Sequence, residues 1–368
     1  MPRATVCLVI SVALLFSIGL LMVFNTTAAE IIDRSLNINT HTPLLKQILY
    51  GTGGVFLGFI VYHWGYESLL RWSFPLLIFA TLLLALIFLP GWGHTINGGR
   101  RWLGIFGFSF QPSECTKILL PAAYIYWYLK QTKPIALISF LKILGAFSIP
   151  IALILLEPDN GTTAILFSLL GILFLLTHIR LSYWALPLLF MVSLGGLAAY
   201  RMPHVHDRIQ IYLHPELDLK GKGHQPHQAK IAAGSGQLLG KGFGESLQKL
   251  NYLPTARSDY IAAIYAEETG FIGVVVLIAL YALLAYGGFA VAIRSKDQGA
   301  FLLASILTFL ISIQAFLNLG IVSGLLPSKG TTLPFFSQGG TSLIINLVCL
   351  FILMDISRKT RGQEDYGK

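Results

Sequence analysis

Two apolar runs joined by a short charged connection decide the class of fold: FIGVVVLIALYALLAYGGFAVAIRSKDQGAFLLASILTFLISIQAFLNLG at residues 271–320. Each run exceeds the roughly 18 apolar residues that a helix needs to cross a bilayer. The charged side chains of the stretch all lie in the connection, at Arg294, Lys296 and Asp297. The stretch therefore predicts two membrane-spanning helices joined by a short polar turn.

The same pattern recurs on both sides of this stretch. Of the 368 residues, 55% are hydrophobic and 12% are charged, whereas about 25% of the residues of a soluble domain are charged. The composition excludes an ordinary soluble domain and predicts an all-α polytopic membrane protein. About ten transmembrane helices are expected, at residues 5–24, 47–63, 72–90, 115–129, 135–156, 163–179, 183–200, 262–293, 300–322 and 342–356.

We expect residues 1–368 to form a single transmembrane domain. Residues 201–261, between the seventh and eighth helices, form a large polar loop, and residues 357–368 form a polar tail. The first apolar run is longer than the roughly 7 to 15 residues of a signal-peptide core. It is therefore expected to be a retained helix.

Lys and Arg in the short connections predict the orientation, because these residues resist translocation. An N-terminus in the cytoplasm places more of them inside than outside. The inner set is Arg3, Arg71, Lys130, Lys133, Arg180, Arg294, Lys296, Arg358, Lys359 and Arg361, and the outer set is Arg34, Lys46, Arg100, Arg101 and Lys329. Both termini are then cytoplasmic, the large loop is outside, and the net charge of +9 does not call for a nucleic-acid partner.

Acidic residues near the membrane boundary are candidates for function, because an unpaired charge there costs several kcal/mol. Those expected at the outer boundary are Glu114, Glu157, Asp159, Asp259, Glu267 and Glu268. Cations are expected at the same level, namely Arg100, Arg101, Lys117, Arg208, Lys249 and Arg257. Such a mixture predicts either structural ion pairs or a site for a phosphate-bearing lipid with a carboxylate as base. The i,i+3 spacing of Glu114 and Lys117 favours a structural pair.

Metal and nucleotide sites are not indicated. The three cysteines lie far apart in apolar runs, and the histidines of the large loop lack a regular ligand spacing. The stretch GKGFG at residues 240–244 lacks the order of residues of a phosphate-binding loop. No metal site is therefore predicted.

Five ordered motifs carry a resemblance to a known family: NGGRRWL, QPSE followed by Lys117, EPDNGT, the run from GSGQLLGKGFG through YLPTARSDYIAA to AEETGFIG, and GLLPSKGTTLPFFSQGGTS. In this order they resemble the SEDS glycosyltransferases of bacterial cell-wall synthesis, the FtsW and RodA group. The resemblance implies a ten-helix enzyme of the cytoplasmic membrane that polymerises lipid II into peptidoglycan strands at its outer face. The PSKG stretch of this chain is more similar to the division-type members of the family than to the elongation-type members.

The resemblance also implies the site residues. Asp259 matches the essential catalytic carboxylate of the family and Asp159 a second required acid. The substrate-binding positions that lie in the shared motifs are Arg101, Trp102, Gln111, Glu114, Lys117, Glu268 and Lys329. Arg208 is added to this substrate-binding set because it matches the arginine of the family's large loop.

No cofactor is required by this chemistry, since the lipid-linked donor carries its own leaving group, although a divalent cation is compatible with it. The expected partners are lipid II, the nascent glycan strand, a class B penicillin-binding transpeptidase and other division proteins. Two rival interpretations stay open: a transporter that flips lipid II, which would make Glu114 and Lys117 the important residues, and a scaffold in which Asp259 is dispensable.

Overall fold

The computed structural model describes residues 3–34, 41–96, 99–105, 108–187, 189, 193, 212, 223–249, 253, 257–327 and 330–366. Its helices are α1 Arg3–Arg34, α2 His41–Trp64, α3 Tyr66–Ile87, α4 Pro112–Leu129, α5 Leu137–Leu156, α6 Asn160–Leu176, α9 His224–Ser235, α10 Ile261–Arg294, α11 Gln298–Val322 and α12 Gly340–Tyr366. Within these ranges, each expected transmembrane helix except the seventh coincides with a helix. The seventh falls mostly outside the described residues.

Seven of the described helices, α1, α2, α3, α5, α10, α11 and α12, are long and apolar enough to span a membrane. Helix α6 is apolar but shorter. The protein is therefore a mostly helical integral membrane protein. The count of ten spans stays a prediction.

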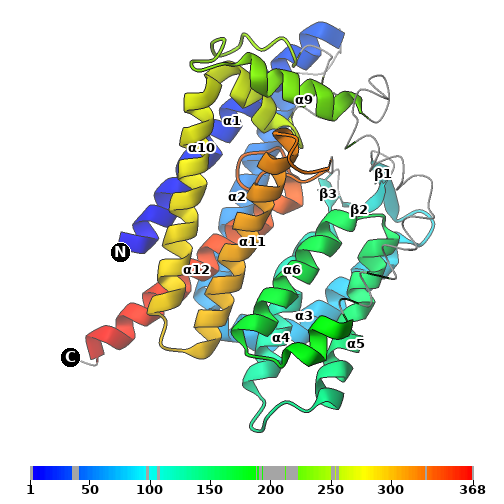
Figure 1. Cartoon of the computed structure of the whole chain (residues 1–368), viewed down its shortest axis with the longest axis vertical. Helices are drawn as coiled ribbons and strands as arrows, with labels where there is room; N and C mark the ends of the chain where they lie inside the picture. The colour runs from blue at the N-terminus through cyan, green and yellow to red at the C-terminus, as the bar shows by residue number, and fades with distance from the viewer. Residues whose placement is uncertain are drawn as a thin grey trace.

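The helices form one bundle in which both consecutive and sequence-distant helices pack side by side. Helix α1 lies along α10, α2 along α12, α3 along α4 and α10 along α11. Both chain termini lie at one end of the bundle, and α9 and the β-strands lie at the opposite end (Figure 1). We call this opposite end the distal end.

A small β-sheet at the distal end corrects the all-α expectation. Strands β1 Gly93–Ile96, β2 Gly99–Ile105 and β3 Phe108–Phe110 form an antiparallel sheet in the order β1-β2-β3. Glycine pairs such as NGG favour tight hairpins, and the segment was expected only to be a polar connection. The sheet matters because β2 carries Arg101 and Trp102.

Helix α10 is interrupted at Gly270, which has φ 68° and ψ −165°. A break in a helix leaves backbone groups without partners. The backbone of residues 237–242 supplies them, forming four hydrogen bonds of 2.8 to 3.3 Å with residues 267–272. Glycine is needed for this close approach, because a Cβ at Gly236 or Gly240 would lie 2.1 Å from a carbonyl oxygen of α10. The GSGQLLGKG segment thus packs closely against the kink in α10 and supplies its backbone hydrogen-bond partners.

Candidate functional site

Arg101 on β2 is the centre of a polar cluster at the distal end. Its Nε donates a hydrogen bond of 3.0 Å to the carbonyl of Glu157, and its Nη2 donates one of 2.7 Å to the carbonyl of Pro158. The third nitrogen, Nη1, is 3.9 Å from Oδ1 of Asp159. One guanidinium therefore holds the turn between α5 and α6 and faces the carboxylate that follows it.

Asp159 caps the N-terminus of α6. Its Oδ1 accepts from the backbone N–H of Thr162 at 3.2 Å, and its Oδ2 accepts from the Thr162 hydroxyl at 2.9 Å. An aspartate at this position satisfies N–H groups that the first helical turn leaves free. Asp159 is 6% exposed, so its observed contacts are those of a capping residue that also faces Arg101.

Gln111 contacts the same cluster. The backbone N–H of Gln111 donates to the hydroxyl of Thr341 at 3.0 Å, which joins the start of α4 to the start of α12. Its side-chain amide reaches Asp159 Oδ2 at 3.4 Å. Trp102 follows Arg101 on β2 and is half-buried. The structure thus brings Arg101, Gln111 and Asp159 into contact, with Trp102 adjacent.

Asp259 lies in the turn that leads into α10 and is half-buried. Burial raises the pKa of its carboxyl group from 3.8 to about 6, and the positive charge of Arg101 and a hydrogen bond from Ser258 oppose the rise. A carboxylate with a pKa near the working pH is suited to act as a general base. The electrostatic influence of Arg101 also links Asp259 to the cluster around Asp159.

Glu157 is a member of the cluster that the motif-based site set did not include. It is 1% exposed, and neither of its carboxylate oxygens has a hydrogen-bond partner among the described residues. Its pKa is raised from 4.5 to about 8, because burial and the charge of Asp159 raise it more than the charge of Arg101 lowers it. Strongly shifted acids are enriched at functional sites. Its spacing of two residues from Asp159, which places two acids in one turn, was the available sequence signal.

Glu114 and Lys117 form the ion pair that their spacing predicts. On α4 the Lys117 Nζ is 2.7 Å from Oε2 of Glu114, and both side chains are buried. Breaking such a buried pair leaves an uncompensated charge, which is strongly destabilising.

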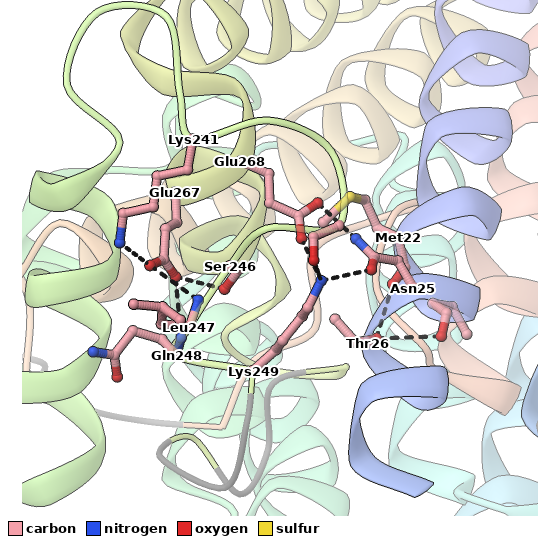
Figure 2. A network of polar contacts seen from close by, with 12 residues as sticks. Met22, Asn25, Thr26, Lys241, Ser246, Leu247, Gln248, Lys249, Glu267 and Glu268 are labelled. Carbon is pink, nitrogen blue, oxygen red and sulfur yellow. Dashed lines mark hydrogen bonds and ion pairs between the residues drawn. The ribbon is translucent and has the colours of Figure 1, made fainter. Parts of the chain in front are cut away.

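Glu268 lies nine residues beyond Asp259, about two helical turns into α10, and belongs to a different network (Figure 2). Its Oε1 is 2.9 Å from Nζ of Lys249, and its Oε2 accepts from Asn25 of α1 at 2.6 Å. The Lys249 ammonium also donates to Oδ1 of Asn25 at 2.8 Å. The structure therefore does not place Glu268 in the Arg101 cluster.

The neighbouring Glu267 completes this second network (Figure 2). It accepts from Lys241 at 2.6 Å and from the Ser246 hydroxyl at 2.5 Å. Two backbone N–H groups, of residues 247 and 248, also donate to it at 3.3 Å. We call the set formed by Asn25, Lys241, Ser246, Lys249, Glu267 and Glu268 the clasp, because it fastens the segment 241–249 to α1 and α10.

Two of the sequence-predicted site residues, Arg208 and Lys329, lie outside the described residues. Among the residues that are described, no three His, Cys, Asp or Glu side chains are grouped so that they could hold a metal ion.

Comparison with known proteins gives consistent results along nearly the whole chain. The family model FTSW_RODA_SPOVE, described as “Cell cycle protein”, matches residues 5–362. A “Probable peptidoglycan glycosyltransferase FtsW” of Trichlorobacter lovleyi is 35% identical, covering 95% of this chain and 92% of that protein. “Stage V sporulation protein E” of Bacillus subtilis is 33% identical, covering 96% of this chain and 97% of that protein.

Solved structures agree with the sequence relatives. A chain from “Structural coordination of polymerization and crosslinking by a peptidoglycan synthase complex” has a TM-score of 0.76 and 26% identity, covering 96% of this chain and 97% of that one. The rod shape determining protein RodA of Thermus thermophilus has a TM-score of 0.68 and 26% identity, covering 96% of each chain.

Proposed function

The chain belongs to the FtsW/RodA/SpoVE family, and from this premise we propose that it is a peptidoglycan glycosyltransferase that polymerises lipid II during septal wall synthesis. The observation that carries the assignment of the site is Asp259, a half-buried acid whose pKa burial raises to about 6 against the opposing charge of Arg101. The FtsW names of the relatives support the division role over the alternative, a RodA-type elongation polymerase.

In the proposed reaction, the 4-hydroxyl of an acceptor GlcNAc attacks the anomeric carbon of a lipid-linked MurNAc and inverts it. The new glycosidic C–O bond forms as the bond to the diphosphate breaks, and the electron pair leaves with the polyprenyl diphosphate. The hydroxyl proton moves to the Asp259 carboxylate. A positioned base of this kind contributes about 10² to 10⁴ in rate.

Cations stabilise the charge that develops on the departing diphosphate. We assign this role to Arg101, Lys117 and Arg208. Asp159 orients Arg101 from its capping position, which is supported by the 3.9 Å approach of the two side chains. Trp102, Gln111, Glu114 and Lys329 complete the proposed substrate-binding set. Glu268 supports the site from the clasp rather than by contact with the substrate.

The reaction requires no cofactor. A divalent cation that bridges the diphosphate and a carboxylate is compatible with the site, and no step of the proposal depends on one.

The membrane orientation is part of the proposal. The excess of Lys and Arg in the connections at the end that carries both termini supports a cytoplasmic location for that end. The distal end is then the outer face of the bacterial cytoplasmic membrane, where lipid II and the nascent strand meet the site. The proposed partner is a class B penicillin-binding transpeptidase, within a larger set of division proteins. The relative that was solved as part of a peptidoglycan synthase complex supports this partner.

Glycan-strand formation from purified lipid II, by the full chain together with its candidate transpeptidase, tests the function. The wild-type complex is expected to make polymer, and an Asp259→Asn variant that still binds the partner is expected to make none. Equal polymer from both proteins would remove Asp259 from the chemistry. Transport of lipid II by a well-folded wild type that makes no polymer would instead favour the flippase.

A further inference from the structure

A single buried amide, that of Asn318 on α11, joins the turn that carries Asp259 to the loop between α11 and α12. Its Nδ2 donates to the Asp259 carbonyl at 2.8 Å and to the Thr331 carbonyl at 2.6 Å. The side chain is 1% exposed. Because an amide nitrogen has two hydrogens, both of its donors are used to connect these two segments.

The carbonyl oxygen of the Asn318 amide makes no comparable contact with a described residue, so the side chain acts through its two N–H donors. Oδ1 of Asn318 is buried and has no hydrogen-bond partner among the described residues. A buried acceptor without a partner costs about 1–3 kcal/mol. An apolar residue would avoid this cost but would remove the donor to both carbonyls.

The loop that Asn318 fixes lies directly against the carboxylate of Asp259. Gly330 precedes Thr331, and a Cβ at Gly330 would be 2.9 Å from Oδ2 of Asp259. A second link supports the same arrangement, because the N–H of Gln338 donates to the carbonyl of Arg257 at 3.0 Å. The position of the loop thus sets how much of the Asp259 carboxylate is shielded from water.

We propose that Asn318 is a positioning residue for the reaction of Asp259, holding the backbone of residues 330 and 331 at a fixed distance from that carboxylate. The inference rests on the proposed function. Asn318 does not contact the substrate in this proposal. It acts through Asp259 by fixing the place of the base and its exposure to water.

Loss of this link has a specific electrostatic consequence. Burial raises the pKa of the Asp259 carboxylate, whereas the charge of Arg101 and a hydrogen bond from Ser258 lower it. Tyr260 follows in the chain, and burial and the charge of Asp259 raise the pKa of its phenol. If the loop moves away, water reaches the carboxylate and its pKa falls from about 6 toward the usual aspartate range. The acid limb of the pH–rate profile then shifts to lower pH.

The chain offers a matched control in Gln314, which lies one turn earlier on α11. It is 3% exposed, and its Nε2 has no hydrogen-bond partner among the described residues. Asn318→Ala and Gln314→Ala therefore remove amides of similar burial from the same helix. Only the first removes a link to the Asp259 turn.

The experiment measures polymerisation of lipid II by the full chain with its transpeptidase partner, across pH, for both variants. Asn318→Ala is expected to lower kcat by about 10- to 100-fold, the scale of a misplaced catalytic group, with KM changed less than about threefold. Its acid limb should move to lower pH by about one unit, because a solvated carboxylate has a lower pKa. Gln314→Ala should keep the wild-type kcat and pH profile.

A second variant keeps the test valid if Asn318→Ala does not fold. Gly330→Ala leaves Asn318 intact but places a methyl group against the Asp259 carboxylate, so it should also lower kcat, with a changed acid limb. The proposal is overturned if either variant is folded and matches Gln314→Ala in both kcat and pH profile. The proposed function fails separately, if wild type makes no polymer or if Asp259→Asn equals wild type.

Discussion

Glu267 and Glu157 are two glutamates of the distal end that are equally buried but differ in their hydrogen-bond donors. Glu267, 0% exposed, receives an ammonium, hydroxyl groups and two backbone N–H groups in the clasp. Glu157, 1% exposed, receives no hydrogen bond from any described residue. Two equally buried acids therefore differ in the number of hydrogen-bond donors that reach them.

The difference has a physical basis. A buried carboxylate that has several donors can stay ionised and hold segments together. A buried carboxylate without donors favours its neutral form, which is consistent with the pKa of about 8 for Glu157. The clasp is thus a structural network, whereas the Arg101 cluster holds acids whose charge can change near neutral pH. The following changes test this contrast, from the largest expected effect to the smallest.

Asp259→Asn should have the largest effect. The amide has nearly the same shape but cannot accept the hydroxyl proton, so the rate of polymerisation should fall by about 10² to 10⁴. Thermal unfolding in detergent should change little, because the buried charge is removed rather than created. A rate within threefold of wild type would place Asp259 outside the chemistry.

Lys249→Met should have the largest effect on stability. It removes the cation from the buried Glu268 and leaves Asn25 as the one partner among the described residues, a loss of about 3–5 kcal/mol for a broken buried pair. Lys241→Met is the control, because Lys241 is 31% exposed and Glu267 keeps Ser246 and two N–H donors. Thermal unfolding of both variants measures the difference. Equal melting temperatures would contradict a structural role for the Lys249 pair.

Glu157→Gln should remove a pH dependence of stability. The folded-state pKa of Glu157, about 8, is above the ordinary value of 4.5. Its contribution to stability is therefore full below pH 4.5 and is lost as pH rises to 8. Between pH 6 and pH 9 this loss amounts to about 2–3 kcal/mol, at 1.36 kcal/mol per pKa unit.

Melting of wild type and Glu157→Gln across this range tests the point. The wild type should lose stability with rising pH more steeply than the variant. Parallel curves would show that Glu157 has an ordinary pKa and has partners in solution.

Asp159→Ala and Asp159→Asn should have the smallest effects on stability. Together they distinguish the role of Asp159 as the cap of α6 from the role of its charge. Alanine loses the cap of α6, at a cost of about 0.5–2 kcal/mol, whereas asparagine caps nearly as well as aspartate. Asparagine nevertheless removes the charge that faces Arg101. If Asp159→Asn keeps the wild-type stability but loses activity, the charge is required. If only Asp159→Ala loses activity, the cap is what matters.

Hydropathy was sufficient to predict most of the helices, because a bilayer demands long apolar runs and the chain has little else. The sheet was not predicted, since strands of three to seven residues leave a weak pattern between glycines. The break at Gly270 could not be predicted from the sequence either, because it depends on hydrogen bonds with the backbone of residues 237–242, about 30 residues earlier in the chain. Long-range backbone pairing leaves no periodicity in a sequence.

The site was predicted unevenly for a similar reason. The family motifs point to Asp259, Asp159 and Arg101, and the structure adds the approach of Arg101 to Asp159 and the electrostatic influence of Arg101 on Asp259. Glu268 was grouped with the substrate-binding residues because it lies in a shared motif, and the structure adds its partners, Lys249 and Asn25. Asn318 carried no signal, since one polar residue in an apolar helix shows neither its partners nor its role.

Parallel measurement of polymerisation and thermal unfolding for Asp259→Asn and Glu268→Gln, each in complex with the transpeptidase, tests the central contrast most directly. Asp259→Asn is expected to be as stable as wild type and to make no polymer. Glu268→Gln is expected to melt at a lower temperature and still to make polymer below its melting temperature. An active Asp259→Asn, or a Glu268→Gln that is fully stable and inactive, would contradict the division between the catalytic cluster and the clasp.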